Sequence, residues 1–319
     1  MLRATASGGV TLGAAPGGHA LEVATPASAV NRVVVNGAAA GSAVSVQAQG
    51  ADANVGLALT PRGSGALSAH TPDGLASGGN ARGANAVDWQ TARAAAVQVG
   101  SGTRCVVGGG QNNTAVGSYS TVGGGDTNVA QSTGATVAGG RGNVASGTDA
   151  WVPGGLQATT RNATGKGAWA SGQFASPGDA QSGEQVLRRQ TTDATPTRLT
   201  ADNGAPGASN TVNLPNNAAF ACRIMVVAKE VGGAAGAKAM WDFVALARRD
   251  AAAVATNVSS SPGNGAAQAP TLAAGTGANA WTVTVGADQT NGGVAVTVVG
   301  AAGANINWVA RILSAEAVG

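Results

Sequence analysis

Residues 106–155 read VVGGGQNNTAVGSYSTVGGGDTNVAQSTGATVAGGRGNVASGTDAWVPGG, and this stretch repeats every 15 residues. A valine, a glycine pair, an asparagine and an alanine each recur at that spacing. The valine and asparagine columns consist of Val107, Val122, Val137 and Val152, and of Asn113, Asn128 and Asn143. Matching columns over three to four successive units indicate a repeat architecture rather than a single globular core.

A period of 15 residues accommodates two short strands and two tight turns. Gly supplies turn positions with positive φ, and Asn tolerates them better than most residues. Successive coils would stack at about 4.8 Å, so four coils would rise about 19 Å, and aligned Asn and Thr side chains would form ladders. The pattern therefore predicts a parallel β-roll over residues 105–182.

One such coil is narrow, because its interior holds little more than Val, Ala and Ser. A short solenoid of this kind would expose an apolar flank and two open sheet edges. Three parallel copies around an axis would bury those flanks, and a dimer or a capped monomer is the alternative. We therefore expect a homotrimer.

The remainder of the chain also has the patterns of β-structure. Residues 31–83 hold short alternating runs, divided by turn signals, and end in a Gly/Ser/Asn-rich linker, whereas residues 84–104 form a connector. Residues 183–319 contain longer strand-like runs, such as Ile306 to Leu313, separated by Gly- and Pro-rich loops. The predicted fold is all-β: short β-repeats, a trimeric 15-residue-coil roll, and an antiparallel β-sandwich.

Composition excludes several classes of protein. Only 10% of the 319 residues are charged, and the net charge of +3 is spread along the chain, so no basic face for nucleic acid is expected. The start, MLRATASGGVTLGAAPGGHA, has no uninterrupted apolar run typical of a signal peptide. No stretch of about 18 apolar residues occurs, so we expect no membrane insertion.

Motifs for catalysis and cofactor binding are missing. The glycines of residues 108–110 precede Gln-Asn-Asn-Thr rather than a phosphate-binding helix start, and no GxSxG occurs. His19 and His70 lack neighbouring ligands and are expected in solvated loops. A trimer axis could still gather three copies of one residue into an ion site. Cys105 and Cys222 are interpreted as reduced thiols that pack as small apolar residues.

Carboxylates and aromatic residues are the side chains that sugar chemistry requires. Glycoside cleavage requires two carboxyl groups about 5 to 10 Å apart, and the 15 acidic residues are scattered, with none set apart as a pair. Aromatic residues are too few to predict a sugar-stacking cleft on the roll. Trp241, Trp281 and Trp308 are expected in the sandwich core, with a receptor platform as the alternative. The chain is therefore predicted to have no catalytic, cofactor or metal site and not to be an enzyme.

The segment GGGQNNTAVGSYSTVGGGDTNVAQSTGATVAGGRGNVASG resembles the head repeats of trimeric autotransporter adhesins, which are left-handed β-rolls and also occur in bacteriophage tail fibres. GSAVSVQAQGADANVGLALTPRGSGAL is similar to a phage fibre module, and GANAVDWQTARAAAVQVGSG resembles the segment that often precedes such rolls. An autotransporter would add a signal peptide, a coiled-coil stalk and a membrane anchor. Their absence favours a phage fibre.

The resemblance implies a homotrimeric structural fibre or spike subunit of a virion, an extracellular particle. Residues 1–30 would join other tail or head proteins, and residues 183–319 would contact a host receptor or glycan. We expect the contacts in loops 201–217, 231–239 and 257–280, near Asn203, Gly233, Ser260 and Asn264. The alternatives are a purely structural head fibre or decoration protein, a polysaccharide-degrading spike, and a fragment of a bacterial surface adhesin.

Overall fold

The computed structural model describes residues 11–12, 21–22, 30–232, 236–250 and 256–319. Strands and one 3-10 turn, η1 (Ala278–Ala280), make up the regular secondary structure of these residues. None of the described segments is a helix long and apolar enough to cross a membrane. The chain divides into two compact units, Met1–Thr60 and Pro61–Gly319.

The first unit contains two antiparallel strand pairs. They are β1 (Thr11–Leu12) with β2 (Leu21–Glu22), and β3 (Asn31–Asn36) with β4 (Ser45–Gly50). Two of the alternating runs predicted from the sequence thus form one hairpin. Residues 51–60 form no strand.

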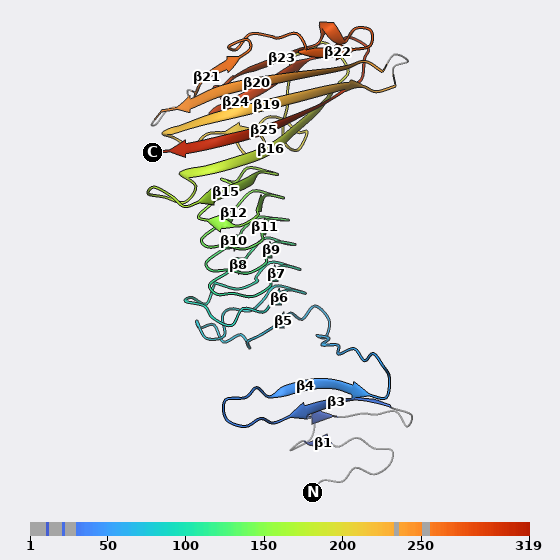
Figure 1. The fold of residues 1–319 in the computed structure, drawn as a ribbon, viewed down its shortest axis with the longest axis vertical. Helices are drawn as coiled ribbons and strands as arrows, with labels where there is room; N and C mark the ends of the chain where they lie inside the picture. Colours follow the sequence, from blue (N-terminus) through green and yellow to red (C-terminus); the bar gives the residue numbers. More distant parts are fainter. Residues whose placement is uncertain (1–10, 13–20, 23–29, 233–235, 251–255) are drawn as a thin grey trace. The chain divides into compact units, whose positions relative to one another are not determined.

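The second unit begins with a β-solenoid of about six turns, with coils of about 15 residues, as predicted. Figure 1 shows its strands stacked one above another. The first column consists of β5 (Leu67–Ser68), β6 (Val87–Asp88), β7 (Val106–Val107), β9 (Thr121–Val122), β11 (Thr136–Val137), β13 (Trp151–Val152) and β15 (Gly167–Ser171). The second column consists of β8 (Thr114–Ala115), β10 (Val129–Ala130) and β12 (Val144–Ala145), and β14 (Gly155–Leu156) pairs with β15.

The parallel column starts earlier than residue 105, where the sequence pattern places the beginning of the roll. Leu67 pairs with Val87, and Val87 pairs with Val106, so the first coils are longer than 15 residues. The segments expected to be a linker and a connector lie within these coils. Their irregular length hides them from a search for a fixed period.

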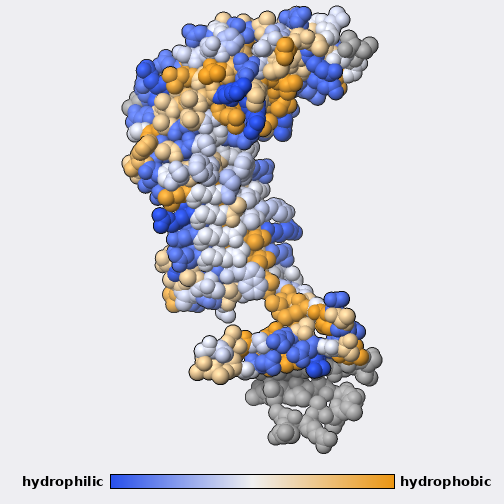
Figure 2. Space-filling model, in the orientation of Figure 1, coloured by the Kyte–Doolittle hydropathy of each residue, from blue (hydrophilic) through white to orange (hydrophobic). Residues whose placement is uncertain are grey.

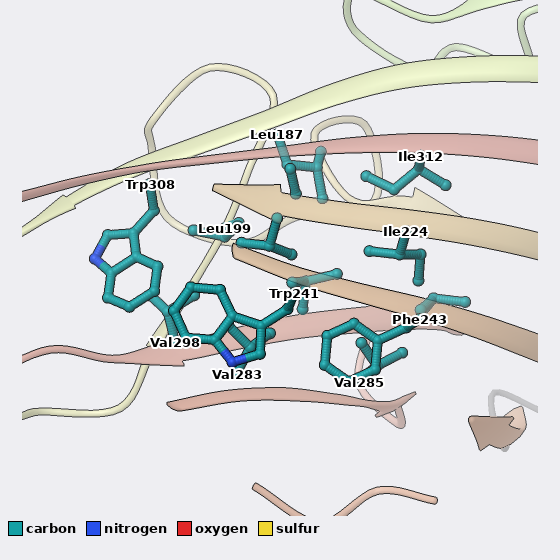
Figure 3. Close-up of a cluster of buried hydrophobic side chains, with 14 of the residues drawn as sticks. Leu187, Leu199, Ile224, Trp241, Phe243, Val283, Val285, Val298, Trp308 and Ile312 are labelled. Carbon is teal, nitrogen blue, oxygen red and sulfur yellow. The ribbon is translucent and has the colours of Figure 1, made fainter. Parts of the chain in front are cut away.

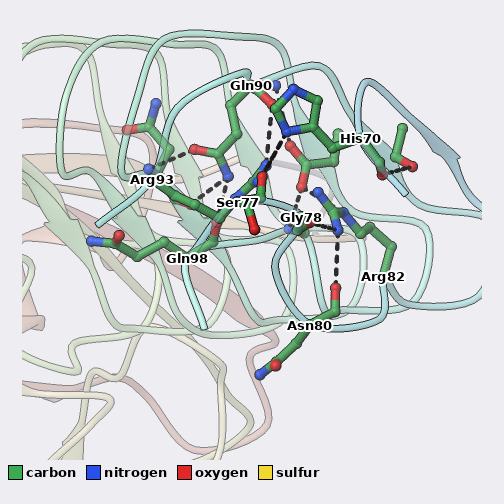
Figure 4. Close-up of polar contacts among 12 residues, drawn as sticks. His70, Ser77, Gly78, Asn80, Arg82, Gln90, Arg93 and Gln98 are labelled. Carbon is green, nitrogen blue, oxygen red and sulfur yellow. Dashed lines mark hydrogen bonds and ion pairs between the residues drawn. The ribbon is translucent and has the colours of Figure 1, made fainter. Parts of the chain in front are cut away.

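Polar side chains close the start of the solenoid (Figure 4). Arg82 and Asp88 form a buried ion pair, with 2.9 Å between Nε and Oδ2. The backbone oxygen of Ser77 accepts a hydrogen bond from Arg93 Nη1 at 2.8 Å and lies 2.8 Å from His70 Nδ1. His70 lies in a bend, as expected, but it is half-buried and its ring is held by these contacts rather than fully solvated. These contacts cap the first coil, which has no preceding coil to pack on.

The repeat columns fill the solenoid interior. Val107, Val122 and Val137 are completely buried, and Val152 is nearly so. The buried asparagines form a ladder in which each carboxamide serves two coils. Oδ1 of one asparagine accepts the backbone N–H of the next, at 3.0 Å for Asn113 to Asn128 and for Asn128 to Asn143. Asn128 Nδ2 also donates to the backbone oxygens of Gly124 at 2.9 Å and Gly140 at 2.8 Å.

Antiparallel sheets form the C-terminal end, as predicted. The larger sheet holds β16 (Ala180–Thr191), β25 (Ile306–Val318), β19 (Ala218–Glu230), β20 (Lys238–Arg249), β21 (Thr256–Ser261) and β22 (Leu272–Ala274). The smaller sheet holds β23 (Thr282–Asp288), β24 (Gly293–Val299), β17 (Thr197–Arg198) and β18 (Val212–Asn213). Side chains from both sheets make one core, part of which is drawn in Figure 3.

Three tryptophans anchor this core. Trp241, Trp281 and Trp308 are at most 2% exposed, which confirms their expected place in the core. The ring centroids of Trp241 and Trp308 lie 5.5 Å apart, and those of Trp281 and Trp308 lie 5.9 Å apart. Such tilted aromatic pairs add to the burial of the indoles themselves.

The solenoid and the sandwich share one sheet. Strand β15 pairs in parallel with β13 on one side and antiparallel with β16 on the other, which gives a single 14-stranded sheet. The boundary expected between residues 182 and 183 falls within β16. No flexible linker therefore separates the two parts.

We predict that Asn128→Ala destabilises the solenoid by about 3 kcal/mol, because it leaves the buried N–H of Asn143 and the carbonyl of Gly124 without partners and removes one of the two hydrogen bonds to the carbonyl of Gly140. Denaturant unfolding of the full chain measures this change. Gln131→Ala, on an exposed side chain of the next turn, is the control and should stay within about 0.5 kcal/mol. Equal effects of the two substitutions would contradict the role of the ladder.

Candidate functional site

The shared sheet presents one continuous outer face. Side chains of the larger sheet alternate between the buried core and solvent, and paired residues in neighbouring strands project from the same face. One row of register partners runs from the solenoid into the sandwich: Val106, Thr121, Thr136, Trp151, Gly167, Glu184, Leu313, Arg223, Val244 and Ser261. We call the side to which Trp151 and Val244 point the outer face.

Two tryptophans border a groove on this face at the junction of solenoid and sandwich. Trp151 is 44% exposed and Trp169 is 49% exposed. Trp151 lies on the bare backbone of Gly167, where a Cβ would come within 2.5 Å of the indole Cε2. The tryptophan groove is lined by Trp151, Pro153, Gly167, Ala168, Trp169, Ser182, Gly183, Glu184, Leu313 and Ser314.

This arrangement suits a ligand with both apolar and hydroxyl-bearing faces. Half-exposed indoles offer flat apolar surface, and tryptophan is enriched where binding energy is concentrated. Polar groups at the rim, from Ser182 and Glu184, can hydrogen-bond to such a ligand. Oε1 of Glu184 accepts a hydrogen bond from Arg311 Nε at 2.7 Å, which orients the carboxylate along the face.

A buried ion cluster lies beneath the groove and ties the last coil to the sandwich. Glu316 in β25 accepts from Lys166 Nζ at 2.6 Å and from Gln181 Nε2 at 2.7 Å, and it also pairs with Arg161. Ser314, which lines the groove, donates to Glu316 Oε1 at 2.8 Å. The cluster joins segments more than a hundred residues apart, so it fixes the position of the groove.

Burial and the attraction between opposite charges shift the pKa values of this cluster in opposite directions. Burial acts to raise the pKa of Glu316, but Lys166, Arg161 and the hydrogen bonds from Lys166 and Gln181 outweigh it and hold that pKa below its ordinary value. Burial lowers the pKa of Lys166, and the attraction of Glu316 opposes this only in part. Nearby, burial raises the pKa of Cys222 to about 12. Cys222 and Cys105 are both buried free thiols, as interpreted from the sequence.

The predicted receptor-contact positions lie apart from this groove. Asn203 is exposed between β17 and β18, and Asn264 is exposed in the turn after β21. Ser260 is not a loop residue: it lies in β21, is buried, and donates to the backbone oxygen of Val285 at 3.1 Å. Strand alternation turns it inward. Gly233, like His19, lies outside the described residues.

Trp151 and Trp169 are not recognisable as a pair in the sequence. Aromatic residues seemed too few for a cleft, yet the fold places two of the six tryptophans on one groove. Trp151 occupies the column of Thr121 and Thr136, whose side chains point outward. This position in the repeat is the one sequence feature that indicates an exposed Trp151. Trp169 follows at a different spacing, so only the structure brings the two together.

No protein-family model and no curated protein sequence matches this chain. Among solved structures, it is similar to the tailspike protein of Acinetobacter baumannii phage AM24, with 8% identity and a TM-score of 0.25 over 66% of this chain and 49% of that one. It is also similar to tailspike gp49 of Acinetobacter baumannii bacteriophage Fri1, described as a capsular polysaccharide depolymerase, with 9% identity and a TM-score of 0.24 over 72% and 44%.

A third similar structure is the tailspike of Acinetobacter phage vB_ApiP_P1, with 8% identity and a TM-score of 0.25 over 75% of this chain and 55% of that one. The chain spans about half the length of these tailspikes. The description of gp49 as a depolymerase overturns the sequence-based conclusion that this chain is not an enzyme. That activity belongs to gp49, and the likeness assigns no activity to this chain.

We predict that Glu316→Gln destabilises the second unit by about 3 kcal/mol near neutral pH, because Lys166 and Arg161 would remain buried without their counter-charge. Thermal and denaturant unfolding measure this loss. Asp242→Asn is the control, since its ion pair with Arg223 lies on the exposed outer face, and we expect little change in Tm.

The pH dependence gives a second readout of the same substitution. The folded pKa of Glu316 lies below its ordinary value of 4.5, so the unfolded chain takes up the proton first as pH falls. The stabilisation is present above pH 4.5 and is lost as pH falls through the folded pKa. The difference between wild type and Glu316→Gln should therefore shrink in acid. A difference that stays constant down to the folded pKa would contradict the role of the charge.

Proposed function

We propose that this chain is the subunit of a homotrimeric virion fibre or spike, and that its C-terminal residues 183–319, together with the last coil of the solenoid, attach the particle to the host surface. The tryptophan groove on the outer face carries this proposal. It is an open, apolar, polar-rimmed surface at the place where the solenoid ends. A tail spike location is consistent with the similarity to phage tailspikes, although that similarity is not the basis of the proposal.

Trimerisation is supported by the side chains that the solenoid leaves exposed. Its interior is filled by small residues, whereas Trp89, Val116 and Tyr119 stand on its surface. Parallel packing of three copies would remove such side chains from water, at about 25 cal/mol per Å² of apolar area. Three-fold symmetry would also multiply weak contacts at the host surface, so that avidity replaces single-site affinity.

The shared sheet supports a rigid connection between the solenoid and the sandwich that would contact the host. A shaft that is hydrogen-bonded directly into its terminal sandwich transmits position without a hinge. Residues 1–30, proposed to join other tail or head proteins, lie mostly outside the described residues, so this assignment rests on the family resemblance.

The oligomeric state is the first test. Light scattering of the purified full chain should give three times the chain mass of 30.4 kDa. A mass of one chain at all concentrations would refute the trimer and leave the exposed solenoid flank unexplained.

Host attachment is the second test. In a panel of bacterial strains, we expect the Trp151→Ala/Trp169→Ala double variant to bind roughly tenfold more weakly than wild type to any strain that wild type binds, because the groove loses both stacking surfaces. Phe174→Ala is the matched control, since this aromatic ring is exposed but does not line the groove. Unchanged binding by the double variant would exclude the groove. Release of oligosaccharide from the bound strain would indicate cleavage in place of simple adhesion.

A further inference from the structure

The outer face of the larger sheet carries more cations than carboxylates. In the described part of the chain, the charged residues of this face come from β16, β19, β20 and β25 and from the residue that follows β20. Its cations are Arg188, Arg223, Lys229, Lys238, Arg248 and Arg311, and its carboxylates are Glu184, Asp242 and Asp250. Figure 2 shows apolar and strongly hydrophilic residues side by side over this part of the molecule.

Three of the cations are neutralised on the face itself. Arg311 pairs with Glu184 at 2.7 Å, Arg223 with Asp242 at 2.7 Å, and Arg248 with Asp250 at 3.3 Å. The other three, Arg188, Lys229 and Lys238, have no carboxylate partner among the residues that the structure describes. The undescribed residues 233–235 and 251–255 contain no acidic residue in the sequence.

These three cations gather toward one end of the sheet. Lys229 and Lys238 are register partners on adjacent strands, and both are exposed. Like charges directly opposite each other in a sheet are destabilising. Glu230 does not neutralise them as a partner on this face, because it alternates to the other side, in register with the buried Ile306.

An apolar shelf adjoins the lysine pair. Val227 pairs with Met240 in the next row, and Val309 and Arg188 continue that row across the sheet. A shallow hollow is lined by Val227, Lys238, Ala239, Met240, Leu272, Ala273 and Ala274. Val227 is 52% exposed and Leu272 is 65% exposed, so the shelf is open to a ligand. Cations beside open apolar surface fit a partner that carries acid groups on a less polar backbone.

We propose that this face binds an acidic polysaccharide of the host surface, with its acid groups at Lys229, Lys238 and Arg188 and its sugar rings along the shelf toward the tryptophan groove. The inference deepens the proposed function and rests on it. Four two-residue steps separate the row of Trp169 and Ser182 from the row of Gln190 and Lys229, which is about 27 Å. Only an extended polymer reaches both ends.

Charge complementarity favours this occupant over a second copy of the chain. A copy that presented the same face would bring its own unpaired cations against Lys229 and Lys238, and the face offers no surplus carboxylate to receive them. A polymer of negative charge removes the repulsion between the two lysines. The contact should therefore weaken with added salt, since these side chains are exposed.

The test compares the full-length wild type with the Lys229→Gln/Lys238→Gln double variant on immobilised polygalacturonate, with neutral dextran as the reference polymer. We expect the wild type to bind polygalacturonate and not dextran, and the double variant to bind about tenfold more weakly at low salt. Arg62→Gln/Arg141→Gln is the matched control, because it makes the same change in net charge at exposed positions away from this face.

Each outcome decides the proposal. Equal loss in the control variant, unchanged binding by the lysine variant, or equal binding to dextran would overturn it. Competition by inorganic phosphate as effective as competition by soluble polygalacturonate would point to a small-anion site and overturn the polymer. Wild type that binds host cells but not polygalacturonate would overturn this inference and leave the proposed function standing. Wild type that binds polygalacturonate through the lysines but binds no cells would refute the proposed function alone.

Discussion

The hydrogen bonds of one short strand, β15, hold the second unit together. Its parallel ladder to β13 closes the solenoid, and its antiparallel ladder to β16 opens the sandwich. A change of pairing direction within one sheet demands that both neighbours share its register, because a slip by one residue would turn every side chain to the opposite face. The row from Val106 to Ser261 exists only because β15 satisfies both conditions. The register of β15 therefore determines where the core, the groove and the cationic end of the sheet lie.

The cluster around Glu316 adds a different kind of specificity to the same junction. Taking a carboxylate and two cations out of water is costly, and this cost is recovered only when geometry and additional hydrogen bonds are good. Gln181 and Ser314 supply these bonds. Gly183 leaves room, since a Cβ there would collide with Glu316. Apolar side chains could fill this volume with greater net stability, but they would not discriminate between alternative seatings of the last coil on the sandwich. We expect the ion cluster to favour the one seating in which all its hydrogen bonds form.

Local pattern and long-range pairing explain what could be predicted from the sequence. The roll was predictable because Val107 and Asn113 recur at a fixed interval, and the sandwich because runs such as Ile306 to Leu313 alternate. The first coils were not, because they have irregular lengths and bury Asp88 and Gln90 where an apolar residue would be expected. The pairing of β16 with β25 joins residues more than a hundred positions apart, and no local signal encodes it. Trp151 and Trp169 come together because β15 pairs with β13, and Leu313 of β25 completes the groove that they border. The trimer and the loop contacts at Asn203 and Asn264 stay predictions.

The asparagine ladder has a direction and two defined ends. Gln90 supplies the acceptor for the backbone N–H of Asn113 at its start, and the N–H of Ala158 takes the last acceptor, Asn143 Oδ1, at its finish. Every coil between them donates and accepts identically. A whole coil can therefore be removed or duplicated without altering the chemistry at either end. The reach of the shaft can change in increments of about 4.8 Å, while the terminal face keeps its register, so length and recognition can evolve independently in this molecule.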